Sequence, residues 1–171
     1  MKKIIYIFLA GIFLSCSSNS DNNNDVGTNS ITGIWRFKID GIQYQWTNGN
    51  TSPLSTDSGS STFLESSSRT EIELWKTYDP IFSFTFKIPT LNTGTYLLSN
   101  ADAYLTDYSG TIVSYYTDDS NKITLNITEI NNNVTPNKIK GTFSGKLFRI
   151  NNQGNSVIKT ISEGYFEAVR E

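Results

Sequence analysis

Ile34 to Trp46 reads IWRFKIDGIQYQW, and this stretch decides the fold of the chain. Large apolar residues alternate with polar ones on both sides of Asp40-Gly41, which predicts a β-hairpin with a two-residue turn. Such a turn makes its flanking residues direct partners, and Gly41 supplies the positive φ that it requires. We therefore expect six core side chains in three pairs: Trp35 with Trp46, Phe37 with Tyr44, and Ile39 with Ile42.

The same two-residue period recurs along the chain and is strongest between Ile81 and Ile88, where Phe82, Phe84, Phe86 and Ile88 share one side. Further strands are expected within 70–76, 93–98, 111–116, 122–130, 138–150 and 156–169. Gly141 and Gly145 suggest a bend or a close approach of the backbone, and Gly164 suggests a bulge. The segments 47–61 and 99–109 lack this pattern and are expected to be loops. The fold class predicted for residues 31–171 is all-β, a single antiparallel β-sandwich-like domain of about nine or ten strands.

The first residues have the pattern of an export signal. Two lysines precede an apolar run from Ile4 to Leu14 that is too short to span a bilayer comfortably. Leu14-Ser15-Cys16 resembles the lipobox of bacterial lipoproteins, in which the cysteine is diacylated and becomes the mature N-terminus. We therefore expect a signal peptide at 1–15, lipidation at Cys16, and a disordered tether at 16–30.

The residues after the cysteine bear on the location. Ser17 rather than Asp follows Cys16, so the resemblance implies the outer membrane. Asp21 and Asp25 faintly resemble the acidic signals that send Bacteroidota lipoproteins to the cell surface, but they fit a plain spacer equally well. The side of the membrane stays open.

The composition excludes several kinds of chemistry. The chain has no histidine and a single cysteine, Cys16, so catalysis by a Ser-His-Asp or Cys-His set is excluded and the commonest metal ligand is missing. The net charge is −2 without a basic cluster, which argues against a nucleic-acid partner. Two carboxylate pairs remain. Glu71 with Glu73 is best explained as a solvated strand face, and Asp118 with Asp119 as a turn that lacks the order of a calcium loop. No enzyme, cofactor or metal site is expected.

Binding is the other functional class that the residues suggest. The aromatic side chains least explained by a core are Trp75, Tyr104, Tyr108, Tyr115 and Tyr116. Aromatic faces beside Asn, Asp and Thr are suited to stacking on sugar rings. The alternative is that these residues only cover a pleated sheet, on which aromatic side chains are favoured in any case.

Four segments together resemble a family. WRFKIDGIQYQW, GTYLL, KIKGTFSGKL and TISEGYFEA, in this order behind a lipobox, are similar to a group of small Bacteroidota lipoproteins with one β-rich domain of unknown function. The resemblance spans nearly all of 33–169, and it implies an envelope location and a sandwich-like fold without assigning any site residue. In addition, Gly33-Ile34-Trp35 resembles the first strand of lipocalin-like barrels, in which a late Arg, here Arg149 or Arg170, packs over the Trp. A lipocalin-like meander barrel is therefore the alternative fold.

These observations lead to one expectation and one alternative. We expect a lipid-anchored outer-membrane or surface domain that binds a glycan or an envelope protein without catalysis. The alternative is a barrel that carries a small apolar ligand. An interior filled by side chains would favour the binding domain, and a closed barrel with an apolar cavity would favour the carrier.

Overall fold

The computed structural model describes residues 33–46, 59–77 and 80–171. The described chain is all-β, without helices, and its eleven strands form one large mixed sheet. Within these residues, no helix is long and apolar enough to cross a bilayer. The strands are β1 (Ile34–Ile39), β2 (Ile42–Trp46), β3 (Gly59–Glu65), β4 (Thr70–Lys76), β5 (Phe82–Ile88), β6 (Gly94–Leu98), β7 (Ala103–Asp107), β8 (Val113–Tyr116), β9 (Ile123–Asn131), β10 (Lys138–Ile150) and β11 (Ser156–Arg170). The predicted signal peptide, Cys16 and the tether lie outside the described residues.

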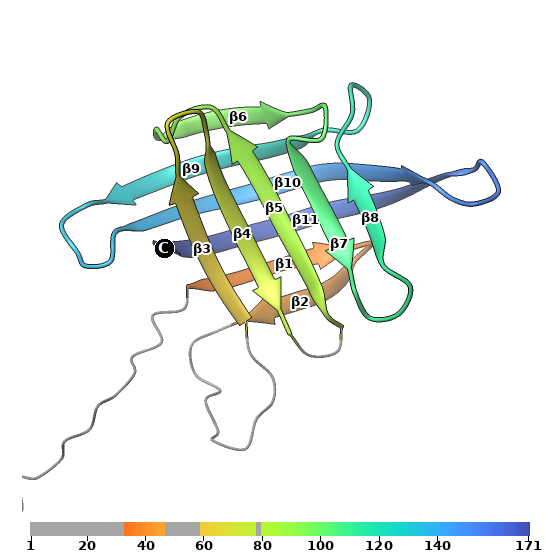
Figure 1. Ribbon diagram of the computed structural model, residues 1–171, viewed down its shortest axis with the longest axis horizontal. Coiled ribbons are helices and arrows are strands. Elements are labelled where there is room, and N and C mark those ends of the chain that lie inside the picture. Colours follow the sequence, from red (N-terminus) through yellow and green to blue (C-terminus); the bar gives the residue numbers. More distant parts are fainter. Residues whose placement is uncertain (1–32, 47–58, 78–79) are drawn as a thin grey trace, which may run out of the picture.

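The strands fall into two groups that cross each other (Figure 1). The front group follows the order β3-β4-β5-β7-β8, and the back group follows the order β2-β1-β11-β10-β9-β6. Two short pairings join the groups: Phe148 of β10 with Tyr116 of β8, and Val169-Arg170 of β11 with Thr62-Phe63 of β3. The second pairing is parallel, so the sheet is mixed, whereas the sequence predicted antiparallel strands only. A parallel pairing is possible here because β3 and β11 are far apart in the sequence and are not joined by a tight turn.

The hairpin register is confirmed. Trp35 pairs with Trp46, Phe37 with Tyr44, and Ile39 with Ile42, and both turn residues have positive φ, 51° at Asp40 and 85° at Gly41. The expected burial is wrong for Ile42, which is 63% exposed, while Ile39 and Tyr44 are half-buried. Since β2 is an edge strand and Ile42 adjoins the turn, no strand covers this end of the hairpin.

Aromatic rings fill the space between the two groups. Phe143 of β10 lies 4.8 to 5.5 Å, between ring centroids, from Phe37, Phe84 and Phe86, so its ring contacts both groups. The predicted inward side of β5 is confirmed, because Phe82, Phe84, Phe86 and Ile88 are all buried. The lipocalin resemblance implied that Arg149 or Arg170 packs over Trp35, whereas the contacts found for these arginines are with other residues. Arg149 lies over the Tyr115 ring and Arg170 pairs with Glu65.

Two segments predicted as loops contain strand residues. The segment 99–109 contains β7, which pairs with β5 and β8 and buries Ala103 and Leu105. The segment 47–61 ends inside β3, which already begins at Gly59. Residues 47–58 of this segment lie outside the described residues. Both strands have weak local patterns and gain their place from long-range pairing. The predicted irregularities are confirmed: the pairing of β10 with its neighbours shifts next to Gly141 and Gly145, and Glu163, beside Gly164, has a φ of 53°.

Candidate binding face

The candidate site lies on the outer face of the front group. Along these strands every second side chain points away from the core, and pairing sets the outward residues in rows across the strands. One row runs through Ser60, Trp75, Ser83, Thr106 and Ser114. The next row runs through Thr62, Glu73, Thr85, Tyr104 and Tyr116. The outer face therefore combines small hydroxyl residues on its central strand with larger residues to either side.

Four of the five predicted aromatic residues gather on this face. The Tyr104 and Tyr116 rings lie 6.2 Å apart between centroids, and the Trp75 and Tyr108 rings lie 5.4 Å apart. Trp75, which the sequence placed among the aromatic side chains least explained by a core, is half-buried. Ser83, although it faces outward, is buried in the row between Trp75 and Thr106. The larger rings thus close over the small residues of β5.

Tyr115 does not join the others. Successive side chains of a strand point to opposite faces, so Tyr115 faces the core while Tyr116 faces outward. Tyr115 is 9% exposed, and the Arg149 guanidinium carbon lies 5.3 Å from its ring centroid. The structure thus assigns Tyr115 a packing role.

A shallow groove runs between the aromatic residues of β7 and β8. Its volume is about 480 Å³, and polar groups lie within it: Lys87 Nζ is 4.9 Å from the Tyr104 ring centroid, and the Thr106 and Ser114 hydroxyls share a hydrogen bond of 3.0 Å. We call it the aromatic groove and define it by its lining residues, which are Lys87, Ala101, Tyr104, Thr106, Tyr108, Ile112, Ser114 and Tyr116. Apolar ring area next to hydrogen-bonding groups is the composition that sugar rings require.

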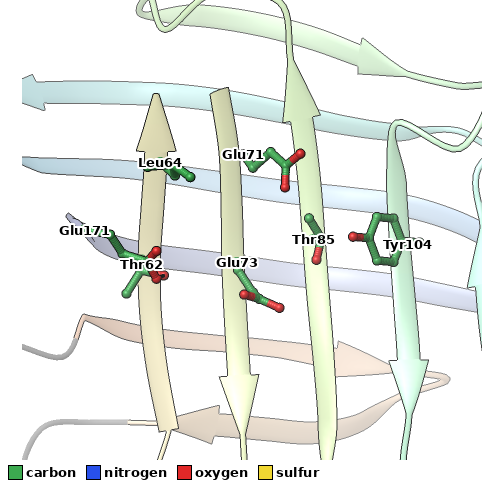
Figure 2. Close-up of a pocket in the computed structure, with 7 residues that line it drawn as sticks. All are labelled: Thr62, Leu64, Glu71, Glu73, Thr85, Tyr104 and Glu171. Carbon is green, nitrogen blue, oxygen red and sulfur yellow. Dashed lines mark hydrogen bonds between the residues drawn. The ribbon is translucent and has the colours of Figure 1, made fainter. Parts of the chain in front are cut away.

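A second, smaller hollow adjoins this groove and shares Tyr104 with it. Its volume is about 270 Å³, and we call it the acidic pocket. Figure 2 shows the Tyr104 hydroxyl pointing toward Thr85 from one side, and Glu73 on the other side of Thr85 with its carboxylate directed toward β5. The lining residues are Thr62, Leu64, Glu71, Glu73, Thr85, Tyr104 and Glu171. No lysine or arginine is among them.

The carboxylates of the acidic pocket differ in their partners. Glu71 forms an ion pair of 2.5 Å with Arg69, and Glu171 Oε1 accepts a hydrogen bond of 2.8 Å from the Thr62 hydroxyl. Within the described part of the chain, Glu73 has neither an ion pair nor a hydrogen bond. Burial raises the pKa of Glu73 above its ordinary value, and the negative charges of Glu171 and Glu71 raise it further.

The sequence pattern indicated a solvated strand face for Glu71 and Glu73 and did not single out Glu171 or Thr85. Glu171 reaches the pocket because β11 pairs in parallel with β3, a contact that no local pattern signals. Thr85 is 3% exposed, and its hydroxyl has no hydrogen-bond partner. A threonine in an alternating strand is unremarkable by itself, so the sequence held no signal for it.

Among the described residues, no group of three or more His, Cys, Asp or Glu side chains is arranged to hold a metal ion. In the 118–121 turn, Asp118 Oδ1 accepts hydrogen bonds from the amides of Ser120 and Asn121, at 2.8 and 2.5 Å, as expected for an Asx turn.

In comparisons with known proteins, no family model, no curated protein and no solved structure matches this chain.

Proposed function

We propose that this protein is a non-catalytic glycan-binding domain, anchored in the outer membrane by lipid on Cys16, and that it binds through the aromatic groove. The observation that carries the proposal is the pair of outward rings of Tyr104 and Tyr116, 6.2 Å apart, beside the hydroxyls of Thr106 and Ser114. Rings of this kind provide apolar area for the faces of a sugar ring, and the hydroxyls provide directional hydrogen bonds to its substituents.

The packing of the interior supports a binding domain rather than a carrier. The six largest fully buried side chains are the aromatic residues Trp35, Phe37, Phe63, Phe84, Phe86 and Phe166. Their rings occupy the region where a carrier would need space for an apolar ligand. A sandwich-like arrangement of the two groups is accordingly the finer description of the fold that we propose. The envelope location, and the relation to Bacteroidota lipoproteins that suggests it, are parts of the same proposal.

The test is binding of the mature lipoprotein, in detergent micelles, to an array of neutral, amino and acidic oligosaccharides. Retention of at least one class is expected, with Tyr104→Ala and Tyr116→Ala each weakening it about two- to tenfold, the effect of losing one ring contact of 0.5 to 1.5 kcal/mol. Tyr165→Ala is the matched control, since Tyr165 belongs to β11 of the back group and should not affect binding.

Two results would contradict the proposal. One is an array on which no oligosaccharide is retained. The other is retention that the Tyr104 and Tyr116 variants leave unchanged. Capture of a purified envelope protein by wild type, but not by these variants, would assign the aromatic groove to a protein partner instead.

A further inference from the structure

The acidic pocket has an unbalanced charge. Glu71 is paired with Arg69 and lies opposite Lys87 across the strands, so its charge is compensated locally. Glu73 and Glu171 have no such compensation among the lining residues, all of which are neutral or acidic. Lys87 lies over the Tyr104 ring and lines the aromatic groove rather than the acidic pocket. The pocket therefore disfavours an anion and attracts a cation.

An unused hydroxyl lies in the same pocket. Thr85 is 97% buried, lines the pocket between Glu73 and Tyr104, and its Oγ1 has no hydrogen-bond partner. Buried polar atoms without a partner are uncommon in folded proteins because water can no longer satisfy them. A polar ligand atom in the pocket would supply the missing hydrogen bond to this hydroxyl. The unpaired hydroxyl therefore points to a ligand independently of the carboxylates.

The donors and acceptors of the pocket define the chemistry of the ligand. A protonated primary amine has three N–H donors and no acceptor. The pocket presents two acceptors without a donor among the described residues, the Glu73 carboxylate and the Thr85 oxygen, and the Glu171 carboxylate, which accepts from Thr62, adds negative charge beside them. The positive charge of an ammonium group would also offset the repulsion between Glu73 and the carboxylates of Glu171 and Glu71. A neutral hydroxyl offers one donor and leaves the charge uncompensated.

The position of the pocket links this amine to the glycan. Tyr104 lines both the acidic pocket and the aromatic groove, so one oligosaccharide can stack on Tyr104 and Tyr116 while a neighbouring unit reaches Glu73. Building on the proposed function, we propose that the acidic pocket binds the protonated amino group of an amino sugar and that the ligand is a glycan with unacetylated amines.

The experiment compares three trimers by calorimetric titration into the mature lipoprotein: β-1,4-linked glucosamine, its fully N-acetylated form, and β-1,4-linked glucose. Wild type is expected to bind the glucosamine trimer about tenfold or more tightly than the other two, since hydrogen bonds to charged groups are the strong ones. Glu73→Gln should remove this preference. Thr85→Val should weaken glucosamine binding without loss of thermal stability, because valine has the same shape and no unpaired hydroxyl.

Glu129→Gln is the matched control, because Glu129 is a surface carboxylate of the back group paired with Lys140 at 3.1 Å. It should leave all three affinities unchanged. Equal affinities for the glucosamine and N-acetylated trimers, or a preference that survives Glu73→Gln, would overturn the amine assignment.

The variants separate this inference from the proposed function. In one outcome, Tyr116→Ala weakens the binding of all three trimers equally and Glu73→Gln leaves their binding unchanged. This result would overturn the amine assignment and leave glycan binding intact. Failure of every oligosaccharide, together with Glu73-dependent binding of a lysine-rich peptide, would overturn both and assign the acidic pocket to a protein partner.

Discussion

At the scale of single residues, Asp40 of the hairpin turn is hydrogen-bonded to β11. Asp40 accepts hydrogen bonds from Lys159 Nζ at 2.8 Å and from the Thr160 amide at 2.9 Å. Partial burial acts to raise the pKa of Asp40, but these hydrogen bonds and the charge of Lys159 outweigh it, so the pKa lies below its ordinary value. Asp40 thus serves both as a turn residue and as a link between the hairpin and β11.

Gly41 allows a test of the turn conformation alone. Its φ is 85°, and a Cβ added there would meet no atom within 4 Å, so a larger residue is penalised by the backbone and not by a clash. Gly41→Val is expected to lower the free energy of unfolding by about 1 kcal/mol or more, measured by urea denaturation. Gly110→Val is the control, since Gly110 is equally uncrowded and lacks a positive φ. Equal stability of the two variants would contradict the assignment of strain to the turn.

Glu73 predicts a pH-dependent stability. Because its pKa is raised in the folded protein, folding favours the protonated form, and stability is lost as the pH rises from the unfolded value of 4.5 through the raised value. Glu73→Gln removes this loss. Thermal melts at pH 7 should show the variant at least as stable as wild type, and the difference should vanish below pH 4.5. A variant clearly less stable at pH 7 would mean that the Glu73 charge stabilises the fold.

At the scale of elements, β5 explains why the candidate face is covered by aromatic residues. Its inward residues are large, Phe82, Phe84 and Phe86, and its outward residues Ser83 and Thr85 are small and buried. Side chains from β4 and β7 lie over them: Trp75 pairs across the strands with Ser83, and Tyr104 with Thr85. The aromatic residues are therefore partly packed and partly exposed. This arrangement permits both roles that the sequence suggested for them, which are covering the sheet and stacking on sugar rings.

Substitution of Trp75 tests how far this side chain contributes to packing and how far it is an exposed surface residue. It is half-buried and contacts the Tyr108 ring, so Trp75→Ala is expected to lower the free energy of unfolding by about 1 to 3 kcal/mol, between the cost of a surface change and that of a buried aromatic. Trp75→Phe keeps a ring beside Tyr108 and should cost less. Urea denaturation measures both. A loss within about 0.5 kcal/mol for the alanine variant would indicate a purely external side chain.

At the scale of the whole molecule, two pairings of distant strands hold the groups together. The contact of β11 with β3 brings Glu171 beside Thr62, and the contact of β10 with β8 places Phe148 beside Tyr116. Each contact is short, with two paired positions in the first and one in the second. The position of the acidic pocket therefore depends on closure of the fold and not on any single element.

The proposed location can be tested on the full chain. Cys16→Ala is expected to abolish membrane association, because each buried CH₂ of an acyl chain contributes about 0.8 kcal/mol and the variant cannot be acylated. Fractionation of cells into soluble and membrane material measures the effect. Ser17→Ala, next to the cysteine, is the control and should stay in the membrane fraction. Equal partitioning of the Cys16 variant and wild type would rule out the lipid anchor.

The sequence by itself determined the all-β class, the hairpin register and the inward side of β5, because side-chain alternation and a two-residue turn act between neighbouring residues. It placed both Tyr115 and Tyr116 among the binding candidates, and the structure showed that Tyr115 is buried while Tyr116 is exposed, because adjacent residues of a strand face opposite ways. Only the tertiary structure decided that β7 is a strand, that β11 runs parallel to β3, and that Glu171 and Thr85 join Glu73. These features depend on which distant strands pair. Strand pairing is selected by the packing of the complete molecule, and the sequence of a single strand does not show its partner.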